Sequence, residues 1–174
     1  MTSMTSPSFR QLASFAVRSE PGNERLALAQ VAEAIAGEGL SPARLDRLKT
    51  AVAETAMNAI EHGNRNQPDL PVAVEVTAAG GDIVVTITDQ GGAPEQAGPS
   101  AEPDLAAKLA GEQAPRGWGL FLIRHMVDAM DVTTEGTRHT VRLVMRAGGR
   151  DEGGGPARPV AAEAGEGGPR EDHV

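Results

Sequence analysis

Two polar side chains, Glu54 and Asn58, lie four residues apart in a segment whose apolar residues recur at helical spacing. Both therefore project from one face of a predicted helix, beside the apolar stripe rather than within it. Asparagine offers a neutral oxygen to Mg²⁺, and glutamate can accept a proton from a hydroxyl group or a water molecule. The pair by itself is explained more simply by a solvated helix face.

A second group, Asp89, Gln90 and Gly91, follows directly after a predicted strand. An aspartate at a strand end can accept a hydrogen bond from an exocyclic amine such as that of adenine. A glycine beside it lets the backbone approach a planar ligand. Aspartate and glycine are also the commonest turn residues, so this tripeptide alone indicates no more than a turn.

The third group, Arg116-Gly117-Trp118-Gly119, precedes a predicted helix that begins near Leu120. Glycines at the start of a helix expose unpaired backbone amides, which form an anion site. The guanidinium group of Arg116 also suits a phosphate. A flexible junction before the helix would explain the same residues equally well.

The segments that position these groups switch between a helical and an extended pattern. Helices are expected over 24–36, over 42–62 with Ser41 as the N-cap, and over 120–130 with Met130 on the apolar face. Strands are expected over 13–18, 72–77, 83–87, 132–134 and 139–146. The second and third strands form a hairpin around Gly80-Gly81, and the last two form another.

This order predicts a two-layer α/β sandwich with a mostly antiparallel mixed sheet, in one domain over residues 13–147. Residues 1–12 are expected to be a flexible lead-in. Residues 148–174, rich in Gly, Pro and Glu, have too little apolar surface to order themselves and are expected to be a disordered tail. The long segment 92–115, with a short helix at 104–109, is expected to be a functional lid.

The composition limits the classes of function. The net charge of -8 argues against a direct nucleic-acid partner, which would need a basic face. The chain has no cysteine, which excludes disulfides and thiolate chemistry and is compatible with the cytoplasm. No apolar run is long enough to span a membrane and no signal peptide is recognised, so a soluble cytoplasmic protein is expected.

The three groups occur in one order, each in the structural context that its chemistry requires. Residues 51–63 (AVAETAMNAIEHG) resemble the N box of the GHKL (Bergerat-fold) ATPase superfamily. Residues 89–91 resemble its first Gly box, and residues 116–123 (RGWGLFLI) its second. Residues 126–128 (MVD) follow as in the anti-sigma-factor serine/threonine kinases of bacterial partner-switching systems. The resemblance extends from Ala13 to Ala147 and implies the Bergerat fold.

The resemblance implies roles for the residues that match the first two boxes. Glu54 would be the general base that activates the substrate hydroxyl, and Asn58 would coordinate Mg²⁺. Asp89 would bind the adenine amine, and Gly91 would shape that pocket. Ala93 stands where the family often has a second glycine, a departure that concerns the hinge of the lid more than adenine binding.

The second Gly box would hold the phosphates of ATP. Gly117 and Gly119 would contact them through the backbone, and Arg116 and Leu120 would complete the nucleotide-binding residues. His62 would either pack beside the nucleotide or cap the end of its helix.

By this resemblance the chain is expected to be an ATP- and Mg²⁺-dependent serine/threonine kinase that acts as an anti-sigma factor. It would phosphorylate a STAS-domain antagonist and would sequester a sigma factor or a similar target. The resemblance leaves open a homodimer and a non-catalytic ATP-binding switch, although Glu54 at the base position argues against the switch. No His precedes Glu54, which argues against a histidine kinase acting on itself, and no transducer domain of a topoisomerase, chaperone or mismatch-repair ATPase is evident.

Overall fold

The computed structural model describes residues 9–91 and 115–148, which form five strands and three α-helices with one π-helical turn. In chain order these are β1 (Phe9–Val17), α1 (Glu24–Ile35), α2 (Pro42–Asn58), the π-helical turn η1 (Ala59–Gly63), β2 (Val72–Ala79), β3 (Asp82–Asp89), α4 (Pro115–Met126), β4 (Ala129–Glu135) and β5 (Arg138–Arg146). The predicted lid and tail lie outside the described residues, except for residue 115 at the end of the lid and residue 148 at the start of the tail.

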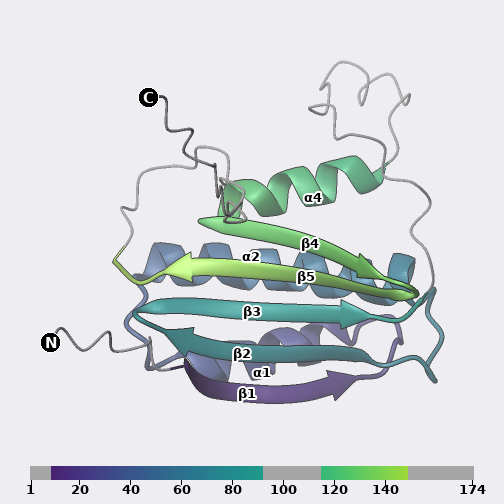
Figure 1. Cartoon of the computed structure of the whole chain (residues 1–174), viewed down its shortest axis with the longest axis horizontal. Helices are drawn as coiled ribbons and strands as arrows, with labels where there is room; N and C mark the ends of the chain where they lie inside the picture. Colours follow the sequence, from purple (N-terminus) through teal and green to yellow (C-terminus); the bar gives the residue numbers. More distant parts are fainter. Residues whose placement is uncertain (1–8, 92–114, 149–174) are drawn as a thin grey trace, which may run out of the picture.

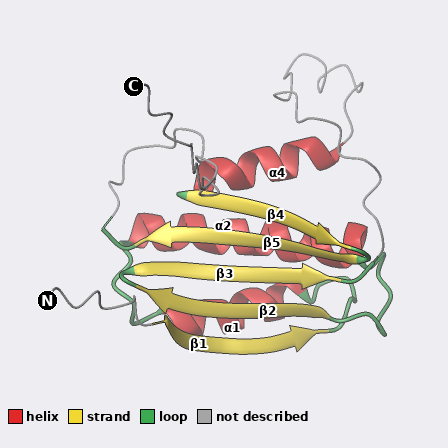
Figure 2. Ribbon diagram, viewed as in Figure 1, coloured by secondary structure: helices red, strands yellow, loops and turns green. Residues whose placement is uncertain are grey.

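The strands form one sheet in the order β1-β2-β3-β5-β4, and all four pairings are antiparallel. Helices α1 and α2 cover one face of this sheet, and α4 packs beside α2 next to β4 (Figure 1). Figure 2 shows the two layers, strands in front and helices behind. The predicted two-layer α/β sandwich is confirmed.

The core between the layers is aliphatic, as the scarcity of aromatic residues predicts. Val72, Val74 and Val76 of β2 are fully buried, whereas the alternating Ala73 and Glu75 are exposed on the other face. The helices contribute their apolar stripes to the same core, and the buried helical members are Ala27, Val31, Ile35, Leu48, Ala51, Val52, Ala56 and Ile123. Phe15 and Phe121 are only partly buried, and Phe9 is exposed.

The predicted hairpin between β2 and β3 turns at two glycines. Ala79 pairs with Asp82, so the loop consists of Gly80 and Gly81 alone, with φ angles of 58° and 91°. Two positive φ angles are the signature of a type I′ turn, whose twist matches that of the flanking strands and which glycine adopts at little cost. This turn sets the register that places Asp89 at the far end of β3.

The sequence predicted the ends of three elements wrongly: those of α4, of β1, and of β4, which begins at Ala129 rather than at residue 132. Helix α4 spans Pro115–Met126 instead of 120–130, and Met130 is buried from β4, where it pairs with Leu143. Proline is well suited to a first helical turn, and the pairing of β4 with β5 prevails over helical periodicity after residue 126. Strand β1 begins at Phe9, inside the predicted flexible lead-in, because it pairs with β2 as far as Ala79.

A buried arginine joins the start of α2 to the far end of the sheet. The helix begins as predicted, with Ser41 Oγ accepting the Arg44 amide at 3.4 Å. The Arg44 guanidinium, 2% exposed, donates through Nε to the Arg146 carbonyl at 2.7 Å and pairs with the Asp128 carboxylate. Asp128 Oδ2 also accepts the Arg146 amide at 2.7 Å. This Arg44–Asp128 clasp holds the segment between α4 and β4 against β5.

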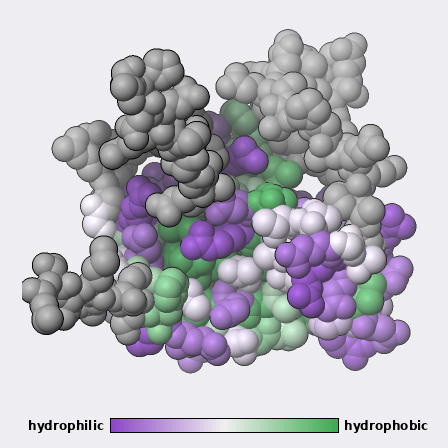
Figure 3. Space-filling model, in the orientation of Figure 1, coloured by the Kyte–Doolittle hydropathy of each residue, from purple (hydrophilic) through white to green (hydrophobic). Residues whose placement is uncertain are grey.

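The sheet face opposite the helices is largely polar. Figure 3 shows hydrophilic residues over much of the described part of this face, with apolar residues nearer its middle. A small second cluster of Val84, Ala129 and Val144 lies on this side, next to the Arg142–Asp131 ion pair at 3.3 Å. Among the described residues, no helix combines the length and the apolar character that crossing a membrane requires.

Candidate functional site

The three groups of predicted site residues meet at one end of the molecule. Strand β3 ends at Asp89, α2 ends at Asn58 and continues into η1, and α4 begins at Pro115. All three ends lie at the right-hand side of Figure 1, where β3 points. The chain order alone could not show this convergence, because more than fifty residues separate the first group from the third.

Asn58 faces the start of α4. A side-chain Cβ built onto Gly119 would lie 3.2 Å from Asn58 Nδ2 and 3.8 Å from its Oδ1. The Asn58 amide therefore lies against a glycine in the second turn of α4, close to where the free amides of a helix start point. The structure thus joins the predicted metal ligand to the predicted phosphate-binding segment.

Glu54 lies one helical turn before Asn58 on the same flank of α2. Its side chain is partly exposed and makes no hydrogen bond or ion pair with any other described residue. It borders a surface hollow of about 360 Å³, whose other lining residues are Leu28, Asp46, Lys49, Thr50 and Ala53. A carboxylate so placed can be reached from solvent by a second molecule.

Asp89 is, in contrast, almost completely buried, with 3% of the residue exposed. Its carboxylate lies against the backbone of Gly63, since a Cβ there would be 2.5 Å from Asp89 Oδ2 and 2.7 Å from Oδ1. Gly91 is packed against the same segment, because its Cβ would overlap the Gly63 carbonyl and lie 2.7 Å from the Asn64 amide nitrogen. Two glycines thus leave room for the carboxylate and for the turn that follows it.

The π-helical turn η1 makes this close approach. In it the Asn64 amide donates to the Ala59 carbonyl at 2.8 Å, one residue further than in an α-helix. The wider turn carries Gly63 out of the path of α2 and towards the end of β3. Such π turns recur at functional sites. The sequence predicted one helix that ends at His62; in the structure α2 ends at Asn58, and the π-helical turn continues to Gly63.

Asn64 is a site residue that the sequence analysis missed. It is fully buried, and its Oδ1 accepts the Gln90 amide at 2.8 Å. Its Nδ2 donates to Ser19 Oγ at 2.9 Å and to the Leu70 carbonyl at 2.8 Å. The side chain therefore ties the turn after β3 to two other loops, and it fixes where Asp89 and Gly91 lie. An asparagine after His-Gly was its only signal in the sequence.

His139 is the second residue that the sequence analysis missed. It pairs with Asp89 across β3 and β5, and its Nδ1 lies 3.3 Å from Asp89 Oδ2. Its side chain is 25% exposed, compared with 5% for that of Asp89. The register between the two strands, which no local pattern encodes, brings this ring to the carboxylate.

The predicted glycine loop of the third group is helical. Arg116, Gly117 and Trp118 lie in the first turn of α4, so the helix starts before them rather than after them. Because the amides of a first helical turn have no partner within the helix, these residues can still form the anion site that the glycines predicted. Leu120 is partly buried and packs against the core, and His62 is exposed on η1. The nucleotide roles of these residues stay predictions.

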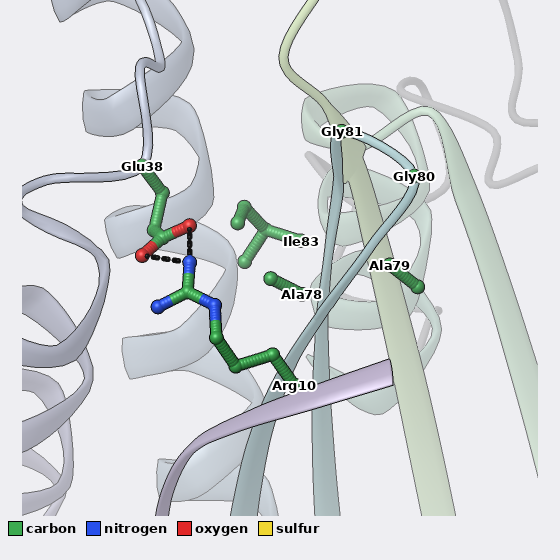
Figure 4. Close-up of a pocket in the computed structure, with 7 residues that line it drawn as sticks. All are labelled: Arg10, Glu38, Ala78, Ala79, Gly80, Gly81 and Ile83. Carbon is green, nitrogen blue, oxygen red and sulfur yellow. Dashed lines mark hydrogen bonds and ion pairs between the residues drawn. The ribbon is translucent and has the colours of Figure 1, made fainter. Parts of the chain in front are cut away.

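A different pocket lies at the opposite end of β3. It has a volume of about 300 Å³ and is lined by Arg10, Glu38, Ala78, Ala79, Gly80, Gly81 and Ile83. Figure 4 shows Arg10 and Glu38 paired across it, with two hydrogen bonds of 2.8 and 2.6 Å. It contains none of the predicted site residues, and we assign it no function.

The donor set at the Asn58 end suits Mg²⁺ better than a metal held by protein alone. No three His, Cys, Asp or Glu side chains in the described part of the chain cluster as a metal site would require. Mg²⁺ in nucleotide sites is held by one or two protein oxygens together with phosphates and waters. A single asparagine oxygen near Gly119 fits that chemistry.

Comparison with known proteins matches the same region. Residues 17–145, which include most of the described fold, match the family described as "Histidine kinase-like ATPase domain". The anti-sigma F factor of Oceanobacillus iheyensis is 30% identical, over 68% of this chain and 80% of that protein. The anti-sigma F factor of Geobacillus stearothermophilus is 29% identical, over 76% of this chain and 88% of that protein.

A solved structure shares the fold. It contains the RsbU and RsbW domains of Rv1364c from Mycobacterium tuberculosis, with a TM-score of 0.56 and 20% sequence identity. The match covers 86% of this chain and 34% of that one, so this chain spans about a third of the solved protein. Together these matches confirm the resemblance found in the sequence: the chain belongs to the histidine kinase-like (GHKL) ATPase family, in the subfamily that contains the anti-sigma F factors.

Proposed function

We propose that this protein is an ATP-dependent serine/threonine kinase that acts as an anti-sigma factor in a partner-switching system. It would phosphorylate a STAS-domain antagonist and would hold a sigma factor, or a similarly regulated protein, when that antagonist is phosphorylated. The observation that carries the proposal is the meeting of Asn58 with Gly119, while Glu54 lies one turn earlier on the same flank of α2.

This arrangement supplies the parts that a nucleotide needs. Asp89, whose carboxylate packs closely against Gly63, would accept the amine of adenine. Asn58 would hold Mg²⁺, which neutralises charge on the phosphates. The first turn of α4, with Gly117 and Gly119, would bind the phosphate oxygens through its amides. By the resemblance, Arg116 would add a positive charge for the phosphates.

Glu54 supplies what a passive binder would not need. Phosphoryl transfer depends mainly on positioning and on charge stabilisation, with a carboxylate to orient the attacking hydroxyl. The Glu54 carboxylate has no hydrogen-bond or ion-pair partner within the described part of the chain, and it borders a hollow that is open to solvent. An acceptor serine or threonine on a second protein could therefore reach it.

The partners follow from the relatives. Proteins named anti-sigma F factor match most of this chain, at up to 30% identity among the relatives cited above. The solved relative carries an RsbW domain in one chain with an RsbU domain. A sigma factor and an antagonist are accordingly the two partner classes that we propose for this protein, and its net charge of -8 suits basic surfaces on them.

The test is a phosphotransfer assay with the full chain, γ-labelled ATP, Mg²⁺ and a STAS-domain protein encoded near it. The wild type should label the STAS protein on a serine or threonine. Glu54→Gln keeps the shape but loses the basic carboxylate, so it should bind ATP within a few-fold of wild type while transfer falls roughly 10²–10⁴-fold. The matched control is Glu75→Gln, on the exposed sheet face, which should transfer at the wild-type rate.

Three results would count against the proposal. Transfer by Glu54→Gln at the wild-type rate would refute the role of Glu54. Tight ATP binding by the wild type without transfer to any candidate antagonist would favour the non-catalytic ATP-binding switch instead. Loss of ATP binding in Glu54→Gln would show that this residue holds the nucleotide rather than the acceptor hydroxyl.

A further inference from the structure

The hollow beside Glu54 extends away from the proposed phosphate site, along the flank of α2. Its other lining residues are Leu28 on α1 and Asp46, Lys49, Thr50 and Ala53 on α2. An α-helix rises about 1.5 Å per residue, so Lys49 lies about 7–8 Å before Glu54 along the helix axis, and Asp46 lies about 12 Å before it. Asn58 is one turn beyond Glu54 in the other direction. The hollow therefore leads from the proposed general base towards the start of α2.

Two of the lining side chains carry charges of opposite sign. Lys49 is half-buried and Asp46 is exposed, and neither side chain forms an ion pair or a hydrogen bond with another described residue. Residues three apart on a helix are placed to pair, but these two do not. Thr50, on the same flank, donates its hydroxyl proton to the Asp46 carbonyl at 2.9 Å. The lysine ammonium and the aspartate carboxylate are thus both available to a second molecule.

The helix fixes the order of these charges along the hollow. Counted from Glu54, the positive charge comes first and the negative charge second, with apolar surface from Leu28 and Ala53 beside them. Charges across an interface contribute more to specificity and register than to affinity, because a partner with like charges opposite them is rejected. A protein that brings a hydroxyl group to Glu54 brings its adjoining surface over the same hollow. Such a pair suits a partner whose surface carries the complementary order of charges.

We propose that this hollow is the docking site for the acceptor protein, and that it selects acceptors by the order of their charges. Lys49 binds an acidic side chain that lies about 7–8 Å from the phosphorylated hydroxyl, and Asp46 binds a basic side chain about 12 Å from it. The inference rests on the proposed function, in which Glu54 activates that hydroxyl. It adds two specificity-determining residues that lie outside all three motifs.

The test measures phosphotransfer by the full chain from ATP and Mg²⁺ to the STAS-domain protein, at increasing concentrations of that protein. The KM for the acceptor reports docking, kcat reports the chemical step, and isothermal titration reports ATP affinity. Lys49→Glu reverses the charge nearer to Glu54. The double variant, Asp46→Lys with Lys49→Glu, keeps the net charge of the chain and reverses only the order of the two charges. The control Arg124→Glu makes the same change of charge on an exposed residue of α4.

Lys49→Glu should raise the KM for the acceptor roughly tenfold or more, because a like charge then faces the acidic side chain. The double variant should raise the KM at least as much, although its net charge equals that of the wild type. In both variants kcat and ATP affinity should stay within about twofold of wild type, since neither residue touches the reacting groups. Arg124→Glu should keep the wild-type KM.

A compensating change in the acceptor identifies the contact directly. Each acidic residue around the phosphorylated position of the STAS protein is replaced by lysine in turn, and one of these substitutions should restore the KM of Lys49→Glu. Should Lys49→Glu fail to fold, Lys49→Gln removes the charge and keeps most of the length of the side chain. It should raise the KM roughly 3- to 5-fold, near the upper limit for a partly exposed ion pair.

A wild-type KM in Lys49→Glu or in the double variant would overturn the inference, and so would the lack of any restoring substitution in the STAS protein. Weaker capture of a sigma factor by Lys49→Glu with an unchanged KM would assign the hollow to that other partner instead. A matching loss of ATP affinity would show a role in the nucleotide site or in the helix itself. In each of these cases the proposed function would stand if Glu54→Gln lost transfer. If the wild type phosphorylated no STAS protein, the proposed function itself would be wrong.

Discussion

Replacing Gly91 by alanine tests the contact between the turn after β3 and the π-helical turn. The added Cβ would overlap the Gly63 carbonyl oxygen and lie 2.7 Å from the Asn64 amide nitrogen. Both obstacles are backbone atoms, which cannot rotate away as a side chain would. The turn must therefore move, and the hydrogen bond of 2.8 Å from the Gln90 amide to Asn64 Oδ1 must lengthen or break.

The cost has two parts. Forcing an extra methyl group into a packed site costs about 1–3 kcal/mol. Leaving the oxygen of the fully buried Asn64 without its donor costs about 1–3 kcal/mol more. Partial relaxation of the turn would offset some of this, so we expect Gly91→Ala to lower the free energy of unfolding by about 2–4 kcal/mol.

ATP affinity should fall further than stability alone would require. The Asp89 carboxylate moves with the turn, and a hydrogen bond from a base amine to a carboxylate is worth about 1.5–3 kcal/mol, or roughly 10- to 100-fold in affinity. Urea denaturation and isothermal titration at a temperature where the variant is folded would measure the two effects. The control is Gly37→Ala, where a Cβ meets nothing within 4 Å. If Gly91→Ala matched Gly37→Ala in both measurements, the packing of the two turns described here would be incorrect.

Three other substitutions give distinct outcomes. Asn58→Ala should abolish the Mg²⁺ dependence of ATP binding. If the ATP affinities of this variant with and without Mg²⁺ differed as much as those of the wild type, Asn58 would not be the metal ligand. Asn64→Ala removes three hydrogen bonds, so it should lower the free energy of unfolding by about 2–3 kcal/mol in urea denaturation and should also lower ATP affinity. Asn64→Asp keeps Oδ1 and should recover part of the ATP affinity. Asp128→Asn weakens the ion pair with Arg44 and should destabilise the fold by about 2–3 kcal/mol. ATP affinity of the folded variant should stay unchanged. A loss of ATP affinity would show that this ion pair also influences the nucleotide site.

Local sequence patterns were sufficient to predict most of the helices and strands. Alternation in β2 and β3, with two glycines between them, predicted a hairpin that the register confirms residue by residue. Ser41 before Pro42 predicted the start of α2. The exceptions lie where tertiary contacts prevail over periodicity. Met130 continues an apolar helical stripe in the sequence, yet pairing with β5 places it in a strand.

The candidate site divides in the same way. Glu54, Asn58 and Asp89 could be proposed from the sequence because their types and their places at helix and strand ends are visible along the chain. Asn64 and His139 were not found, because their importance depends on contacts with residues 26 and 50 positions away. A buried asparagine and a strand histidine have no local signature, so only the register of the sheet and the path of the π turn identify them.

Under the proposed function, the difference in exposure between the two carboxylates has a physical reason. Asp89 recognises a rigid base, and a buried acceptor that is held in place by glycine backbones and by His139 requires little ordering when the base binds. Glu54 must meet a hydroxyl group that belongs to another protein. A carboxylate as buried as that of Asp89 could not be reached by that protein. Glu54 therefore has to lie on an open flank of α2, one turn from the proposed metal ligand. Under this proposal, nucleotide recognition would lie in the interior of the fold and the protein substrate would bind at its surface.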